Sequence, residues 1–182
     1  MQAPRMEIDV REDANADELL TAFFTLHVDR LRGRRAERMA EAERSFRRCL
    51  EGRIEQLLTP AERTVLHAER EFQPLGAGAR LAAPSVILQV LPVFLETWGG
   101  AEIEERRVQL TVAERLLDFV STFPPIADEV APFRMPVRIA LRRSRRRYDF
   151  ARMEERWRDA QARDPRLADL PMIPVRAREG ES

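Results

Sequence analysis

Residues 81–98 read LAAPSVILQVLPVFLETW and form the most apolar stretch of the chain. Its length suggests a membrane span, but two prolines, Gln89 and Glu96 interrupt it. Such a run is typical of a buried protein core rather than of a transmembrane helix. We therefore expect residues 84–98 to lie at the centre of the fold and expect no membrane partner. The pattern alone leaves open whether they form one helix, or a strand followed by a helix from Pro92.

The remaining sequence is highly charged and well balanced. Of the 182 residues, 44% are hydrophobic and 34% are charged, with 31 acidic and 31 basic side chains. A chain of this length and composition can form one domain that buries roughly 70% of its unfolded surface. Every basic residue is Arg. GC-rich coding explains this bias, and so does selection for guanidinium groups, which bind carboxylate or phosphate in a fork.

The single cysteine and the N-terminal charges indicate a compartment. Cys49 cannot form an internal disulfide bond, which is compatible with a reducing cytoplasm. Residues 1–15 are acidic, the opposite of a secretory signal peptide. We therefore expect a soluble, cytoplasmic protein.

A long apolar stripe with a helical period follows the acidic segment. It predicts one amphipathic helix over residues 16–58, about 60 Å long. Gly33 falls inside the stripe and should weaken this helix by about 1 kcal/mol without ending it. Because such a helix is longer than a compact body of this size, we expect part of the stripe to contact another molecule. The stripe consists of Leu20, Phe24, Val28, Leu31, Met39, Ala42, Phe46, Leu50, Ile54 and Leu57.

Two similar hexapeptides indicate helix starts. Residues 58–63 read LTPAER and residues 110–115 read LTVAER. In each, a Thr followed three residues later by Glu is a capping box, in which each side chain bonds the other residue's backbone N–H. The sequence therefore predicts helices over 60–72 and 112–121. Because the residues that follow the two boxes differ, the repeat indicates shared capping chemistry rather than duplication.

The middle of the chain resembles the element order of winged-helix domains. Gly99-Gly100 predicts a turn, and the weak alternation of Val108 and Leu110 allows a small β-hairpin near 100–110. The resemblance covers about fifty residues and implies a DNA-reading helix at 84–98. That segment carries large apolar side chains instead of polar base-readers. A winged helix here would therefore pack against protein.

The C-terminal third contains the strongest chemical feature. A Pro-rich connector over 124–135 leads into a predicted helix over 136–163, where residues 134–147 carry seven Arg and no acid. Such a face binds phosphate, pairs with acidic protein or is solvated, and other anions are a further alternative. The candidate anion-binding residues are Arg134, Arg138, Arg142, Arg143, Arg145, Arg146, Arg147 and, for stacking on bases, Tyr148.

The same helix changes its apolar side. Val137, Ala140, Leu141 and Tyr148 share one side of a helical wheel, whereas later apolar residues lie on the opposite side. The helix therefore contacts two different bodies or is broken near Asp149. The extended Pro-rich tail, 164–182, is also apolar in part and predicts a docked arm. The candidate protein-interface residues are Phe150, Met153, Trp157, Leu170, Met172 and Ile173.

Motifs for catalysis are missing from the sequence. His27 and His67 do not stand at metal-ligand spacings, and Cys49 lies beside the apolar stripe, where a thiol is usually inert. We find no Gly-rich phosphate loop and no nucleophile elbow. We therefore expect a protein that is not an enzyme and has no cofactor or metal site.

Together these features predict a mainly α-helical protein. The predicted body, residues 16–123, packs the long N-terminal helix with two or three shorter helices, and an Arg-rich helix follows. The surplus apolar helix surface favours an adaptor or assembly subunit that binds other protein chains, including copies of itself. The alternative is a nucleic-acid-binding accessory protein that grips phosphates with the Arg face of residues 136–148.

Overall fold

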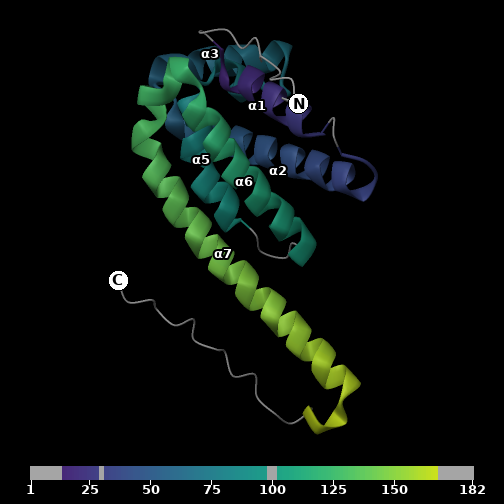
Figure 1. Ribbon diagram of the computed structural model, residues 1–182. Coiled ribbons are helices and arrows are strands. Elements are labelled where there is room, and N and C mark those ends of the chain that lie inside the picture. The colour runs from purple at the N-terminus through teal and green to yellow at the C-terminus, as the bar shows by residue number, and fades with distance from the viewer. Residues whose placement is uncertain (1–13, 29–30, 98–101, 168–182) are drawn as a thin grey trace, which may run out of the picture.

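The computed structural model describes residues 14–28, 31–97 and 102–167, and every regular element within these ranges is helical (Figure 1). The mainly α-helical prediction is confirmed. In chain order the elements are α1 (Ala16–Val28), α2 (Arg34–Leu57), α3 (Pro60–Phe72), α4 (Ala77–Leu81), α5 (Ser85–Glu96), α6 (Ile103–Thr122), the 3-10 turn η1 (Pro124–Ile126), α7 (Ala127–Arg163) and the 3-10 turn η2 (Pro165–Leu167).

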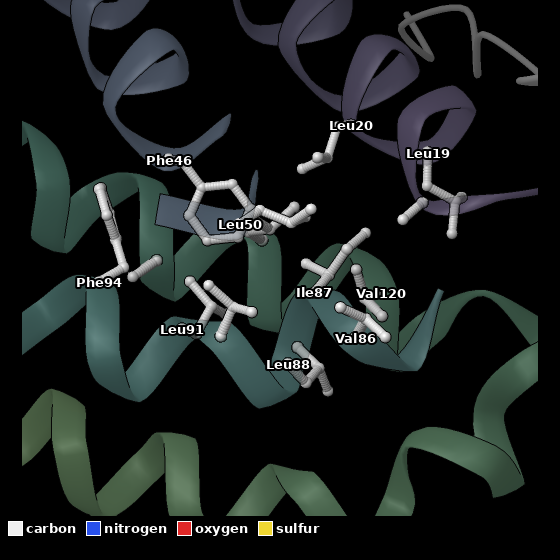
Figure 2. Packing of buried hydrophobic residues seen from close by; sticks show 14 of the residues in the cluster. Leu19, Leu20, Phe46, Leu50, Val86, Ile87, Leu88, Leu91, Phe94 and Val120 are labelled. Carbon is white, nitrogen blue, oxygen red and sulfur yellow. The ribbon is translucent and has the colours of Figure 1, made fainter. Parts of the chain in front are cut away.

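The central apolar segment forms one helix, α5, which settles the choice that the sequence left open. Helices α1, α2, α6 and α7 all contact it. Figure 2 shows α5 side chains such as Ile87 and Leu91 meeting residues of α1 and α2. The rings of Phe46 and Phe94 join α2 to α5 edge to face, 5.1 Å apart. Eight of its twelve residues are buried, and the other four, Gln89, Pro92, Val93 and Glu96, share the one side that its neighbours leave less covered.

The stripe over residues 16–58 belongs to two helices, so the prediction of a single long helix is wrong. The described chain leaves α1 at Val28 and starts α2 at Arg34. Gly33 adopts a φ of 56°, which a right-handed helix cannot contain and which glycine adopts at no steric cost. The chain reverses direction at this point. Arg47 of α2 therefore reaches α1, where it pairs with Asp17 and donates to the Thr21 hydroxyl at 3.0 Å.

The stripe is largely covered by the fold itself. Seven of its ten residues are buried, Val28 and Leu31 are partly covered, and Leu57 is 39% exposed. Because the chain turns back between α1 and α2, both helices face the same core, whereas one continuous helix would extend beyond that core. The expectation that this stripe needs a partner molecule is therefore wrong for most of its length.

Helix α3 begins at Pro60, and its capping box is formed. The Thr59 hydroxyl accepts from the Glu62 amide at 3.3 Å, and Glu62 Oε2 accepts from the Thr59 amide at 2.7 Å. Both bonds satisfy amides that a helix start leaves unpaired. The carboxylate of Glu62 is stabilised by the Thr59 hydroxyl and amide, and these contacts lower its pKa.

The second hexapeptide does not start a helix. Helix α6 begins at Ile103, and its capping box is formed by Glu102 and Glu105. Thr111 lies inside α6, where its hydroxyl donates to the Arg107 carbonyl at 2.9 Å. The possible β-hairpin near 100–110 is not shown, because residues 103–110 are helical and residues 98–101 lie outside the described ranges.

The predicted Pro-rich connector is mostly helical. Only η1 separates α6 from α7, and α7 contains Pro132 and Pro136 within its first turns. Helix α7 therefore begins at Ala127, nine residues before the predicted start at 136. The predicted tail starts with η2, and residues 168–182 lie outside the described ranges.

No helix in the described part of the chain has both the length and the apolar character needed to cross a membrane.

Candidate interaction surface on α7

The inner face of α7 fixes the helix to the body. Val137, Leu141 and Tyr148 are buried on this face, and α7 makes its main contacts with α5 and α6. Ser144 is also buried, and its hydroxyl donates to the Leu95 carbonyl near the end of α5 at 3.3 Å. The apolar side chains hold α7 by burial, and the Ser144 bond fixes its position along α5.

Beyond Tyr148, α7 extends away from the body. None of its residues from 149 to 163 is buried, and the helix runs past the last turn of α5 and the first turn of α6 (Figure 1). This distal part is about 22 Å long at 1.5 Å per residue. The helix is continuous through Asp149, so the sequence alternative of a break at that point is wrong.

The opposite face of α7 carries a line of large apolar side chains that we call the outer row: Met135, Ile139, Phe150, Met153 and Trp157. Met135 is 57% exposed, and Ile139 and Phe150 are each 44% exposed, although all three are large hydrophobic residues. Met153 and Trp157 are partly covered. At 100° per residue these five positions lie within about 60° of one another, on the side away from Val137 and Tyr148.

Sequence patterns predict only the later half of the outer row, Phe150, Met153 and Trp157. Met135 falls in the predicted connector, and Ile139 stands among arginines that mask its apolar character. Continuing the wheel backwards from Phe150 in steps of three and four would have found both. The remaining candidates, Leu170, Met172 and Ile173, lie outside the described residues.

Arg142 and Arg146 interrupt the outer row in its middle. Both are exposed and lie on the same side of the wheel as Ile139. Arg138, Arg143, Arg145 and Arg147 flank this line and are exposed as well. Of these six α7 arginines, only Arg145 has an ion-pair partner within the described ranges, Glu114 of α6 at 3.9 Å. That pair is open to solvent and contributes little, so the guanidinium groups are available to bind an anionic group.

Arg134 and Tyr148 do not belong to this available set. The Arg134 guanidinium donates to the carbonyls of Ser121 at 3.0 Å and Ala127 at 2.9 Å, so it joins the end of α6 to the start of α7. Tyr148 is only 5% exposed on the inner face, which removes it as a stacking platform for bases. We therefore assign structural roles to both side chains.

A second group of exposed apolar side chains, which no sequence pattern indicates, lies on α3 and the turn between α3 and α4. Phe72 is 87% exposed and Leu75 is 86% exposed, with Val65 of α3 at 53%. Leu75 also borders a surface cavity of about 510 Å³ together with Arg44 and Arg48 of α2. These residues are local to one corner of the body, whereas the outer row follows the helix that leaves the body.

Within the described residues no group of three or more His, Cys, Asp or Glu side chains is placed to hold a metal ion. Cys49 borders a shallow cavity of about 390 Å³ with Arg48 and Arg53. Burial raises the pKa of the Cys49 thiol, which keeps it protonated and a poor nucleophile.

Comparisons of the chain with protein-family models, with curated protein sequences and with solved structures find no match. A functional proposal for the chain therefore rests on its own surface chemistry.

Proposed function

We propose that this chain is a non-enzymatic adaptor or assembly subunit, and that the outer row of α7 binds another protein. The observation that supports the proposal is the exposure of Met135, Ile139 and Phe150 along one face of a helix that projects from its own body. Apolar side chains repeated along one face of a projecting helix are typical of a helix-docking surface.

The three exposed side chains Met135, Ile139 and Phe150 supply too little binding energy on their own, so a stable contact needs further residues. Full burial of a large apolar side chain is worth about 1.5–3 kcal/mol, so covering three half-exposed residues gives roughly 3 kcal/mol. Micromolar binding requires about 8 kcal/mol. The distal residues Met153 and Trp157 and the neighbouring guanidinium groups must therefore contribute for the contact to be stable.

The proposal can be tested by isolating the chain with its partners from its native cells and measuring the mass of the intact complex by native mass spectrometry. The double variant Ile139→Ser and Phe150→Ser should lose the partner, whereas Phe72→Ser with Leu75→Ser should retain it. The second pair is a matched control, because it removes exposed apolar area of the same kind from α3 and α4. A chain that stays monomeric under all conditions, or that loses its partner only in the control, would contradict the proposal.

Nucleic-acid binding is the second candidate, and the exposed arginines without ion-pair partners favour it. Each phosphate that they neutralise would add about 0.9 to the slope of log affinity against log salt. Binding to a generic duplex and to a single strand should be measured over a salt series. The substitution of Arg142, Arg145 and Arg146 by Ala should abolish such binding, and no binding by the wild type at low salt would remove this candidate.

A further inference from the structure

The outer row and its two arginines have the spacing of a helix–helix seam. Positions 135, 139, 142, 146, 150, 153 and 157 follow one another in steps of three or four residues. Such steps keep side chains on one line of a helix and are the spacing by which two helices interlock. The line has a charged middle, with apolar residues on either side.

On the basis of the proposed function, we infer that the partner is an amphipathic helix of a different protein with Asp or Glu at its centre. Covering Arg142 and Arg146 with apolar side chains would strip water from two charges without replacing its hydrogen bonds. Carboxylates opposite them would supply charge-assisted, bidentate bonds. Apolar residues at the two ends of the partner helix would cover Ile139 and Phe150.

A second copy of this chain does not satisfy this requirement. Residues 134–147 carry seven Arg and no acid, so a parallel copy would place Arg142 and Arg146 against their own equivalents. An antiparallel copy centred between these arginines and Phe150 would place Arg142 opposite Met153. The parallel arrangement brings like charges together, and the antiparallel one places Arg142 against an apolar side chain, with carboxylates only at the flanking positions Asp149 and Glu154.

The position of the arginines also disfavours base-specific reading of DNA and binding to a lipid surface. A helix that reads DNA carries polar side chains along the line that faces the bases, whereas this line carries Met135, Ile139 and Phe150. A helix that lies in a membrane interface places its basic residues on the flanks of the apolar face. Here Arg142 and Arg146 lie within that face.

The inference can be tested with displayed libraries of helical peptides. Each peptide carries fixed apolar residues at its two ends and fully randomised positions at the centre, and the full chain is the target. Selection on the wild type should enrich Asp and Glu at the centre. Selection on the variant R142E/R146E should enrich Lys and Arg at the same positions. A selected acidic peptide should bind this variant at least about tenfold more weakly than the wild type.

The control variant is R34E/R35E, which makes the same change of net charge at the start of α2. Arg34 and Arg35 are exposed, so this variant should bind the acidic peptide as the wild type does. All four arginines lie on the surface, and unchanged thermal unfolding would show that both variants fold.

Three failures can be told apart. Peptides that depend on Ile139 and Phe150 but show no acidic preference would overturn the partner chemistry and leave the proposed function standing. If no selected peptide depends on the outer row, both proposals are wrong. If a DNA duplex or an anionic vesicle binds the wild type more tightly than the best acidic peptide, and R142E/R146E abolishes that binding, the partner is of another class and the inference is overturned.

Discussion

Tyr148 and Phe150 lie two residues apart on α7, and replacing each by Ala tests whether the helix has two faces with different roles. Tyr148 is 5% exposed and packs on the body, whereas Phe150 is 44% exposed on the outer row. Truncating a buried aromatic residue to Ala costs about 3–5 kcal/mol. The better helix propensity of Ala returns roughly 0.5 kcal/mol. We therefore expect Tyr148→Ala to lower the free energy of unfolding by about 3 kcal/mol.

Phe150→Ala should leave the free energy of unfolding within about 1 kcal/mol of the wild type, because exposed positions contribute little to folding. For a chain of this size, 1 kcal/mol corresponds to about 2–4 °C in melting temperature, so Tyr148→Ala should melt about 6–12 °C lower. Thermal unfolding followed by circular dichroism separates these values. Equal destabilisation by both substitutions, or by neither, would refute the assignment of an inner and an outer face.

Three further predictions concern the body, and urea unfolding checks each of them. Gly78→Ala should destabilise by about 1–3 kcal/mol, because a Cβ there would lie 2.8 Å from Ile54 Cγ2. Gly52→Ala should stabilise by roughly 0.5–1 kcal/mol, because a Cβ at this α2 position meets no atom within 4 Å. Thr59→Ala should cost about 1 kcal/mol at neutral pH through the lost cap. The Thr59 hydroxyl also donates to Glu62 Oε2 at 2.7 Å and lowers the pKa of Glu62, so the part of the stabilisation that this bond supplies is complete above the ordinary value of 4.5 and is lost as the pH falls through the lowered folded value. The difference between Thr59→Ala and the wild type should therefore shrink in acid.

The helical class and the buried centre were predictable because they depend on local signals. The apolar run that became α5 and the capping box at Thr59 identify themselves by composition and spacing. The break at Gly33 was not predictable from the stripe. Helices α1 and α2 face the same core, so the apolar period continues across the turn. The break between them is visible in the positive φ of Gly33, which the sequence pattern does not predict.

The candidate surface was less predictable, since it depends on which side of α7 the body occupies. The sequence predicts that α7 has two apolar sides, but it also predicts that Tyr148 and Arg134 are available to bind an anion. Tyr148 is buried against α5 and α6, and the Arg134 guanidinium is occupied by the carbonyls of Ser121 and Ala127. Dense arginines also hid Ile139, whose exposure becomes apparent only when the inner face is known.

Because α7 is one continuous helix, the distance and the direction of its far end relative to the body are fixed. Its inner residues fix one end on the body, so each added residue in the projecting part moves the far end by about 1.5 Å and turns it by about 100°. One residue inserted after Asp149 would rotate Phe150 and Trp157 out of line with Ile139 while leaving the body unchanged. Insertion of a whole turn would restore their direction at a greater distance. Under the proposed function, the length and phase of α7 set how far from the body, and at what angle, a bound partner is held.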